Sequence, residues 1–162
     1  MNLHNKIPTV YMICGFVGAG KTTFARKLEE ETGAVRITKD EWLVSIFGNN
    51  PAKDTFKDYD DRVTRLAIDF AFRLVAAGVD VIIDDFSWIK ADRKEMRERI
   101  LRAGAKPVLY FVDKPIEEMR RRVAERSKNP PADSFVISDE LFSFYLDYWQ
   151  PPGDDEEFVR VG

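Results

Sequence analysis

The sequence Gly15-Phe16-Val17-Gly18-Ala19-Gly20-Lys21-Thr22 stands between an apolar run that ends at Cys14 and an amphipathic segment. It matches the pattern G-x-x-x-x-G-K-[ST] in full, in the strand-to-helix context that this pattern requires. Its three glycines permit backbone conformations that a Cβ would obstruct, so that consecutive N–H groups can surround phosphate oxygens at a helix N-terminus. The sequence therefore predicts a strand, a phosphate-binding loop and a helix in this order.

The side chains of this loop indicate a nucleoside triphosphate with a metal ion. We expect Lys21 to reach the β- and γ-phosphates and the Thr22 hydroxyl to ligate Mg²⁺. The expected ligands are therefore ATP and Mg²⁺, and the residues expected to bind the nucleotide are Gly15, Gly18, Ala19, Gly20, Lys21, Thr22 and Thr23. The alternative is a glycine-rich turn that binds no ligand.

Outward from the loop, short apolar runs alternate with segments of helical periodicity. Strands are expected at Val10 to Cys14, Ala34 to Thr38, Val79 to Asp84, Lys106 to Val112 and Phe158 to Val161. Helices are expected at Lys21 to Glu31, Asp40 to Phe47, Lys57 to Ala77, Ala91 to Ala103, Pro115 to Arg126 and Ser138 to Tyr148. This alternation predicts an α/β three-layer sandwich around a mostly parallel sheet of about five strands.

Size and composition limit the alternatives. The 162 residues suit one domain, spanning 1–162, and the 44% hydrophobic content is ordinary for a globular chain. The net charge of −3 argues against a nucleic-acid partner, and the lone histidine, His4, against histidine catalysis or histidine metal sites. No apolar run approaches the roughly 20 residues that span a bilayer, and no signal-peptide layout is present, so we expect a cytoplasmic protein without a membrane partner.

Two adjacent aspartates end the third expected strand. Asp84 and Asp85 follow the apolar residues Val81 to Ile83, which places a carboxylate at the carboxyl edge of the sheet, where ligands bind in open α/β folds. Side chains alternate along a strand, so one of the two is expected to face the site, and either is a candidate metal ligand. The alternative role is a helix cap in the following turn.

Asp40 follows the second strand at the same edge. Its carboxylate is a candidate general base that accepts a proton from an attacking hydroxyl, and the competing interpretation is a helix N-cap.

Arginines gather before the proline-containing segment 127–133. Arg122 and Arg126 share a helix face by the four-residue rule, which indicates a lid over the phosphates that covers about residues 120–137, whereas a solvated basic face is the alternative for any single arginine. The aromatic residues at 142, 144, 145, 148 and 149 are expected to pack a core face, with a base-stacking platform as the alternative.

Together these segments resemble the P-loop kinase group of AAA-domain-like ATP-binding proteins, related to polynucleotide kinases, zeta toxins and chloramphenicol phosphotransferases. The likeness rests on GFVGAGKTT, ITKDEW, VIIDDFSWIKADR, MRRRVAERS and WQPPGDDE. It implies a P-loop NTPase fold with a small helical lid, Asp40 as base, Lys21, Arg122 and Arg126 as further catalytic residues, and Arg126 and Pro152 near the nucleotide. In this group the arginine matching Arg93 follows the third-strand aspartate.

Two departures from the polynucleotide kinases bear on the acceptor. Leu43 stands where those kinases commonly carry an arginine that holds the substrate phosphate, and Ser87 stands where many relatives carry asparagine. We therefore expect a kinase acting on the hydroxyl of a small molecule. The alternatives are a 5′-hydroxyl polynucleotide kinase, a zeta-toxin-like kinase and a non-catalytic ATP-binding module. Acceptor contacts have no sequence signature, although Trp42, Phe47, Phe56 and Tyr59 are candidates.

Overall fold

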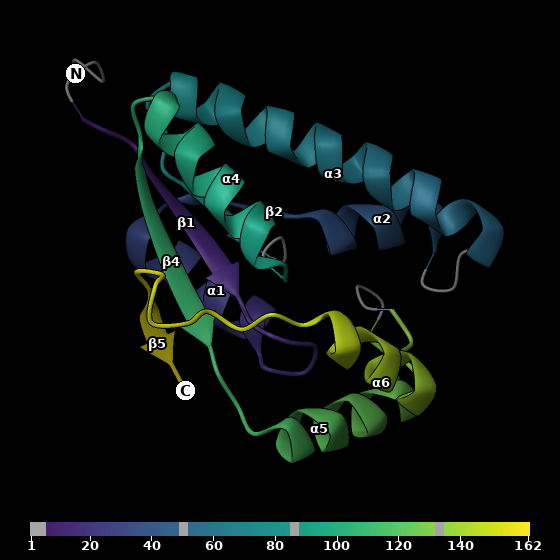
Figure 1. Ribbon diagram of the computed structural model, residues 1–162. Helices are drawn as coiled ribbons and strands as arrows, with labels where there is room; N and C mark the ends of the chain where they lie inside the picture. The colour runs from purple at the N-terminus through teal and green to yellow at the C-terminus, as the bar shows by residue number, and fades with distance from the viewer. Residues whose placement is uncertain (1–5, 49–51, 85–87, 132–134) are drawn as a thin grey trace.

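The computed structural model describes residues 6–48, 52–84, 88–131 and 135–162. Five parallel strands form its centre (Figure 1), in the order β2-β3-β1-β4-β5. They are β1 (Thr9–Cys14), β2 (Val35–Thr38), β3 (Val81–Asp84), β4 (Lys106–Val112) and β5 (Val159–Val161). All four described strand pairs are parallel, so the expected sheet is confirmed.

Six helices connect and flank the strands. They are α1 (Lys21–Thr32), α2 (Lys39–Phe47), α3 (Lys53–Ala76), α4 (Lys90–Arg102), α5 (Ile116–Lys128) and α6 (Asp139–Tyr148). Two boundaries differ from expectation. Helix α3 begins earlier, because backbone bonds to Ala52 O close a first turn that has no apolar periodicity. Helix α5 continues two residues into the expected loop and ends before Pro130, as helices commonly do.

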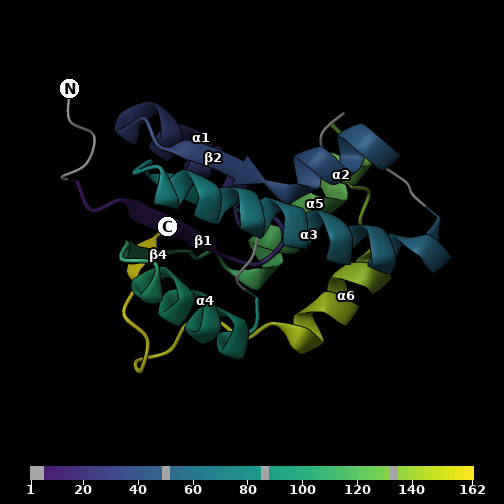
Figure 2. The same ribbon diagram turned by 90° about the horizontal axis from the view of Figure 1, so that it is seen from above.

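The helices cover both faces of the sheet. One buried cluster joins alternate residues of β1 to α3 and α4, and a second joins the opposite face to α1 and α5. Figure 2 shows α1 and α4 on opposite sides of the strands. The expected three-layer architecture is confirmed, and the alternation of side chains along each strand explains how one short apolar run serves two cores.

Strand pairing brings the candidate residues to one edge. At the carboxyl end of β3, Asp84 pairs with Thr38 of β2 and with Ile13 of β1. The loop that follows β1 and the helix that follows β2 therefore begin on either side of Asp84. No helix in the described parts of the chain has the length and apolar character that crossing a bilayer requires.

Candidate functional site

The glycine-rich loop is shaped by contacts that leave no room for side chains. Gly18 and Gly20 have φ values of 83° and 99°, in the left-handed region that favours glycine. A Cβ at Gly15 would lie 2.7 Å from the carbonyl oxygen of Val112, and one at Gly18 would lie 2.6 Å from that of Met119. The loop therefore packs directly on the end of β4 and on α5. Ala19 N donates to Phe16 O at 3.1 Å and closes the turn.

A large cleft opens beside this loop, with a volume of about 1310 Å³. Pockets for one small ligand commonly measure about 300–1,000 Å³, so this cleft has room for more than one. Figure 1 shows α2 and α3 on one side and α5 and α6 on the other. Among the expected site residues, Gly18, Lys21, Thr22, Thr23, Asp40 and Arg126 line it.

Lys21 and Thr22 stand in the first turn of α1, at the mouth of the loop. The N-cap of α1 is Gly20, which provides no side-chain hydrogen bond, so the first turn has amide donors directed toward the cleft. Nζ of Lys21 donates to Phe16 O at 3.2 Å, which folds the side chain back along the loop. Both residues are half-buried.

Asp40 lies in the first turn of α2 and lines the same cleft as Lys21 and Thr22 of α1. The N-cap of this helix is Thr38, so the N-cap interpretation of Asp40 is wrong. A carboxylate in the first turn is stabilised by the helix dipole, and in this position it remains accessible to the cleft.

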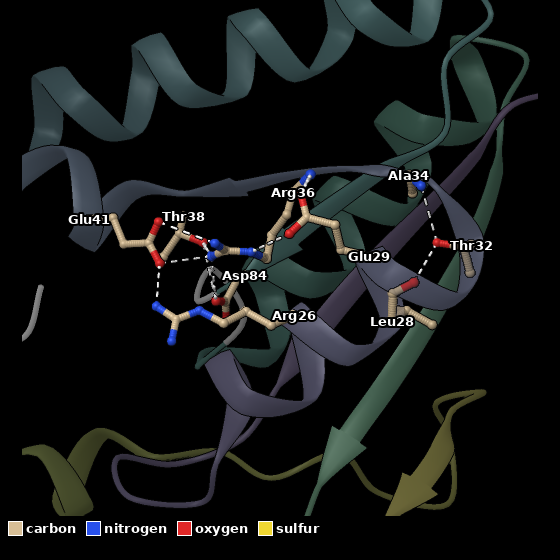
Figure 3. Close-up of polar contacts among 9 residues, drawn as sticks. All are labelled: Arg26, Leu28, Glu29, Thr32, Ala34, Arg36, Thr38, Glu41 and Asp84. Atoms are coloured by element: carbon tan, nitrogen blue, oxygen red, sulfur yellow. Dashed lines mark hydrogen bonds and ion pairs between the residues drawn. The ribbon is translucent and has the colours of Figure 1, made fainter.

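Asp84 is the described member of the aspartate pair, and Asp85 lies outside the described residues. The side chain of Asp84 is completely buried, and its Oδ2 accepts a hydrogen bond from Thr38 Oγ1 at 3.3 Å (Figure 3). Nη1 of Arg36 lies 3.8 Å from the same oxygen. Thr38 lines the cleft, whereas the buried carboxylate of Asp84 lies directly behind it and is not among the lining residues.

Arg36 is the centre of a charged network that joins α1, α2 and the sheet. Its Nε donates to Glu29 at 3.1 Å, and its two terminal nitrogens donate to the two oxygens of Glu41 at 3.0 and 3.3 Å. Arg26 donates to Glu41 from the other side at 3.0 Å. Burial raises the pKa of Glu41, but the hydrogen bonds from Arg36 and Arg26 lower this pKa further, so the net shift is downward.

The arginines of α5 have different surroundings. Arg122 forms an ion pair with Glu118 at 2.6 Å, and its Nη1 would lie 3.8 Å from a Cβ at Gly20. Arg126 lines the cleft, and its buried Nε has no hydrogen-bond partner among the described residues. Arg120 contacts α6 through Asp139 and Ser143 instead, and Arg121 is exposed. Arg122 is exposed like Arg121 and does not line the cleft, so of the expected lid pair the structure brings only Arg126 into it.

Arg93 is buried and binds the segment that precedes β5. Its guanidinium donates to both oxygens of Glu156, at 2.7 and 2.6 Å, and to the carbonyl oxygen of Gln150 at 2.7 Å. Pro152, between these two partners, is buried and does not line the cleft. The structure therefore does not bring this proline into the cleft with Lys21, Thr22 and Arg126.

The expected aromatic core face of α6 is only partly correct. Phe142 is buried and contacts Phe16, and Trp149 packs on the same ring. Tyr145 and Phe144 line the cleft, and Phe144 is 54% exposed. Helical periodicity does not distinguish the core-facing side of α6 from its cleft-facing side, because both sides carry aromatic residues.

Of the four candidate acceptor contacts, one lines the cleft and three do not. Phe56 lines the cleft and meets Phe135 edge-on, with ring centroids 5.4 Å apart. Phe47 and Tyr59 stack on each other at 3.9 Å and join α2 to α3. Trp42 packs against Phe70, so these three contribute to the α2–α3 contact.

Sequence reasoning missed Arg26, Arg36 and Thr38 as residues of the site. The available signal was the pair of polar residues that alternates with Val35 and Ile37 in β2. In a strand covered on both faces, such residues need partners inside the fold.

The residues present fit ATP and Mg²⁺. The cradle at Gly15 and Gly18 would be filled by any Cβ, and the buried Nε of Arg126 is a donor that a phosphate oxygen would satisfy. Mg²⁺ commonly takes one or two protein ligands together with phosphate oxygens and water. Thr22 and Asp84 are the described candidates for this role. The described residues contain no cluster of three or more His, Cys, Asp and Glu side chains arranged to hold a metal ion.

Comparison with known families gives one match, to the family described as AAA domain, over residues 10–148. This range runs from β1 to α6 and includes every described residue of the cleft. No curated protein matches the chain at a significant level.

Solved structures share the fold at low sequence identity. A candidate kinase from Chloroflexus aurantiacus superposes with a TM-score of 0.77 at 14% identity, covering 97% of this chain and 86% of that one. A sugar kinase from Janibacter superposes with a TM-score of 0.63 at 20% identity, with coverages of 96% and 84%. A chain of the Pnkp1/Rnl/Hen1 RNA repair complex gives a TM-score of 0.73 at 22% identity, where the match covers 91% of this chain but only 45% of that one. The expected P-loop NTPase fold and kinase-group resemblance are confirmed.

Proposed function

We propose that this chain, which belongs to the AAA domain family, is a Mg²⁺-dependent kinase that transfers the γ-phosphate of ATP to a hydroxyl of a small molecule. The observation that carries the proposal is the placement of Asp40 and the phosphate-binding loop in one cleft. A nucleotide-binding module without catalysis needs no carboxylate in the cleft beside its phosphate-binding loop.

Each residue has a separate part in this mechanism. The amides from Gly15 to Thr22 and Nζ of Lys21 would bind the phosphates, and Thr22 and Asp84 would hold Mg²⁺, which when bound would neutralise charge on the transferring group. Asp40 accepts the proton of the acceptor hydroxyl as its oxygen approaches phosphorus. Arg126, with Arg122 beside Gly20, stabilises the charge on the equatorial oxygens. Catalysis is thus positioning and electrostatic stabilisation, as expected for a loose transition state.

The acceptor side of the cleft favours a neutral or cationic molecule with an apolar surface. The cleft lining includes the apolar side chains of Phe56, Phe135, Val136, Ile137 and Phe144. The carboxylates of Asp60, Asp61, Asp92 and Glu140 also line it. With Asp40 and Glu41 the described lining of the cleft contains six carboxylates, against the four cations Lys21, Arg26, Lys39 and Arg126, which leaves an excess of negative charge. An anionic acceptor would meet net repulsion there.

Leu43 argues against the polynucleotide kinase alternative. Its side chain is 1% exposed and packs in the core beneath α2, so this position contributes no contact to a substrate phosphate. We accordingly propose a small-molecule acceptor, a nucleic acid being a less favoured partner, and a cytoplasmic location for the enzyme.

The proposal is tested by transfer of γ-labelled phosphate into panels of neutral, amine-bearing and anionic alcohols and into 5′-hydroxyl oligonucleotides. We expect transfer to a neutral or amine-bearing acceptor, and Asp40→Asn should lower kcat by about 10²–10⁴-fold. Asp54→Asn, in the exposed first turn of α3, is the matched control and should retain activity. Binding of ATP without transfer to any acceptor would refute the kinase, and transfer to oligonucleotides alone would establish the polynucleotide alternative.

A further inference from the structure

Arg36 contacts the three elements that carry the proposed catalytic groups. From β2, its guanidinium binds Glu29 on α1, Glu41 on α2 and Asp84 at the end of β3. Helix α1 begins with Lys21 and Thr22, and Glu41 directly follows Asp40. We propose that Arg36 is a positioning residue, which sets the metal-side carboxylate of Asp84 and the base Asp40 relative to the phosphate-binding loop; the assignment rests on the proposed function.

The chain of hydrogen bonds to Asp84 has a defined direction. Nη1 of Arg36 donates to Thr38 Oγ1, which leaves the Thr38 hydroxyl proton to donate to Asp84 Oδ2 at 3.3 Å. These two residues approach the same carboxylate oxygen (Figure 3). The arrangement orients the carboxyl plane from the sheet side, as outer partners of a metal ligand do.

The fork of the guanidinium matters as well as its charge. Its two terminal nitrogens bind the two oxygens of Glu41, while Nε binds Glu29. A lysine at position 36 would have one nitrogen and could not hold both helices with this geometry. The side chain of Arg36 is only 12% exposed, so solvent does not replace these contacts readily.

One partner of Arg36, Glu29, is partly exposed, so its charge can be removed without creating a cavity in the core. Glu29 is 42% exposed, and Glu29→Gln keeps the shape of the side chain while it removes the negative charge and one of the two oxygens that accept hydrogen bonds from Arg36. Glu31, two residues further along α1, forms an exposed pair with Lys27 at 3.6 Å, and among the described residues it forms no ion pair with Arg36 or Arg26. The substitution Glu31→Gln is therefore a matched control on the same helix.

The test measures binding of a fluorescent ATP analogue at increasing Mg²⁺ and, separately, in EDTA. For Arg36→Lys we expect the Mg²⁺ concentration that gives half-maximal tightening to rise about 10–100-fold, the range typical for outer partners of metal ligands. Glu29→Gln should shift it in the same direction by less, and Glu31→Gln should leave it unchanged. Binding in EDTA should change less than about threefold in all three variants, because the loop amides are intact.

A Mg²⁺ dependence of Arg36→Lys equal to that of the unaltered protein would overturn the inference, since charge alone would then suffice. An equal loss of binding with and without Mg²⁺ would also overturn it, since that result indicates general damage to the loop. Arg36→Met serves as a further variant, with Arg62→Met, in an exposed pair on α3, as its control. These readouts use binding only, so they decide the role of Arg36 even if phosphoryl transfer, and with it the proposed function, fails.

Discussion

The phosphate-binding loop and α5 are in backbone contact: a Cβ atom at Gly18 would lie 2.6 Å from the carbonyl oxygen of Met119. The same Cβ would lie 2.9 Å from Val123 Cγ2. The helix that carries Arg122 and Arg126 is therefore seated on the loop that binds the phosphates. This contact explains how Arg126 of α5 and Gly18 of the loop come to line one cleft.

We expect Gly18→Ala to destabilise the fold and weaken ATP binding. The positive φ of Gly18 costs about 1–3 kcal/mol for alanine, and the overpacking against α5 costs about 1–3 kcal/mol more. Gly33→Ala is the control, because Gly33 has a φ of 70° but nothing within 4 Å of the added Cβ. Thermal unfolding should give a lower Tm for Gly18→Ala than for Gly33→Ala. Equal Tm values would show that α5 shifts to accommodate the added methyl group without loss of stability.

Arg126→Ala should reduce kcat with little effect on unfolding. Its guanidinium lines the cleft, where it would meet charge that develops during transfer, so we expect a loss of about 10²–10³-fold. Arg121→Ala removes an exposed arginine of the same helix and should leave kcat unchanged. Steady-state kinetics test this, and a change in KM alone for Arg126→Ala would assign the arginine to ground-state binding.

Arg93→Met should release the segment that leads to β5. The substitution leaves the carboxylate of Glu156 without its buried cation, and removing one partner of such a pair typically costs about 3–5 kcal/mol. Arg97→Met is the control one turn along α4, where the pair with Glu157 is exposed and worth about 0–1 kcal/mol. Urea unfolding measures both, and hydrogen exchange should show faster exchange around residues 150–157 in Arg93→Met only.

The thiol of Cys14 should be unreactive in the folded protein. Burial raises its pKa from 9.0 to about 12, although Arg93 and Lys21 nearby act in the opposite direction. At pH 8 the thiolate fraction is then about 10³-fold smaller than in the unfolded chain, so modification by a thiol reagent should be slower by at least this factor. Because the folded pKa is the higher one, the associated stability is fully present below pH 9.0 and is lost as the pH rises toward 12. Rapid labelling of native protein at pH 8 would contradict the burial of Cys14.

Much of the sheet and of the phosphate-binding loop was predictable from local patterns. Strand β4 has the expected bounds, and the buried runs of β1 and β3 needed no knowledge of their neighbours. The first turn of α3 was not predictable, because one apolar residue, Phe56, gives no periodicity and the hydrogen bonds to Ala52 lack any sequence signal. Apolar periodicity indicates which side of a helix is buried, so it does not predict a helical turn that has no side packed against the core.

The sequence by itself determined the order of the elements, the phosphate-binding loop and the presence of a carboxylate at the end of β3. These features depend on residues that are neighbours in the chain, such as the glycines that a tight loop requires. Only the tertiary structure decided that Arg122 lies beside Gly20, that Arg93 binds Glu156, and that Arg36 joins α1, α2 and β3. An arginine has the same local propensity in each of these places. Its partners come from segments up to 63 residues away, and only the packing of the sheet and helices brings them within hydrogen-bonding distance.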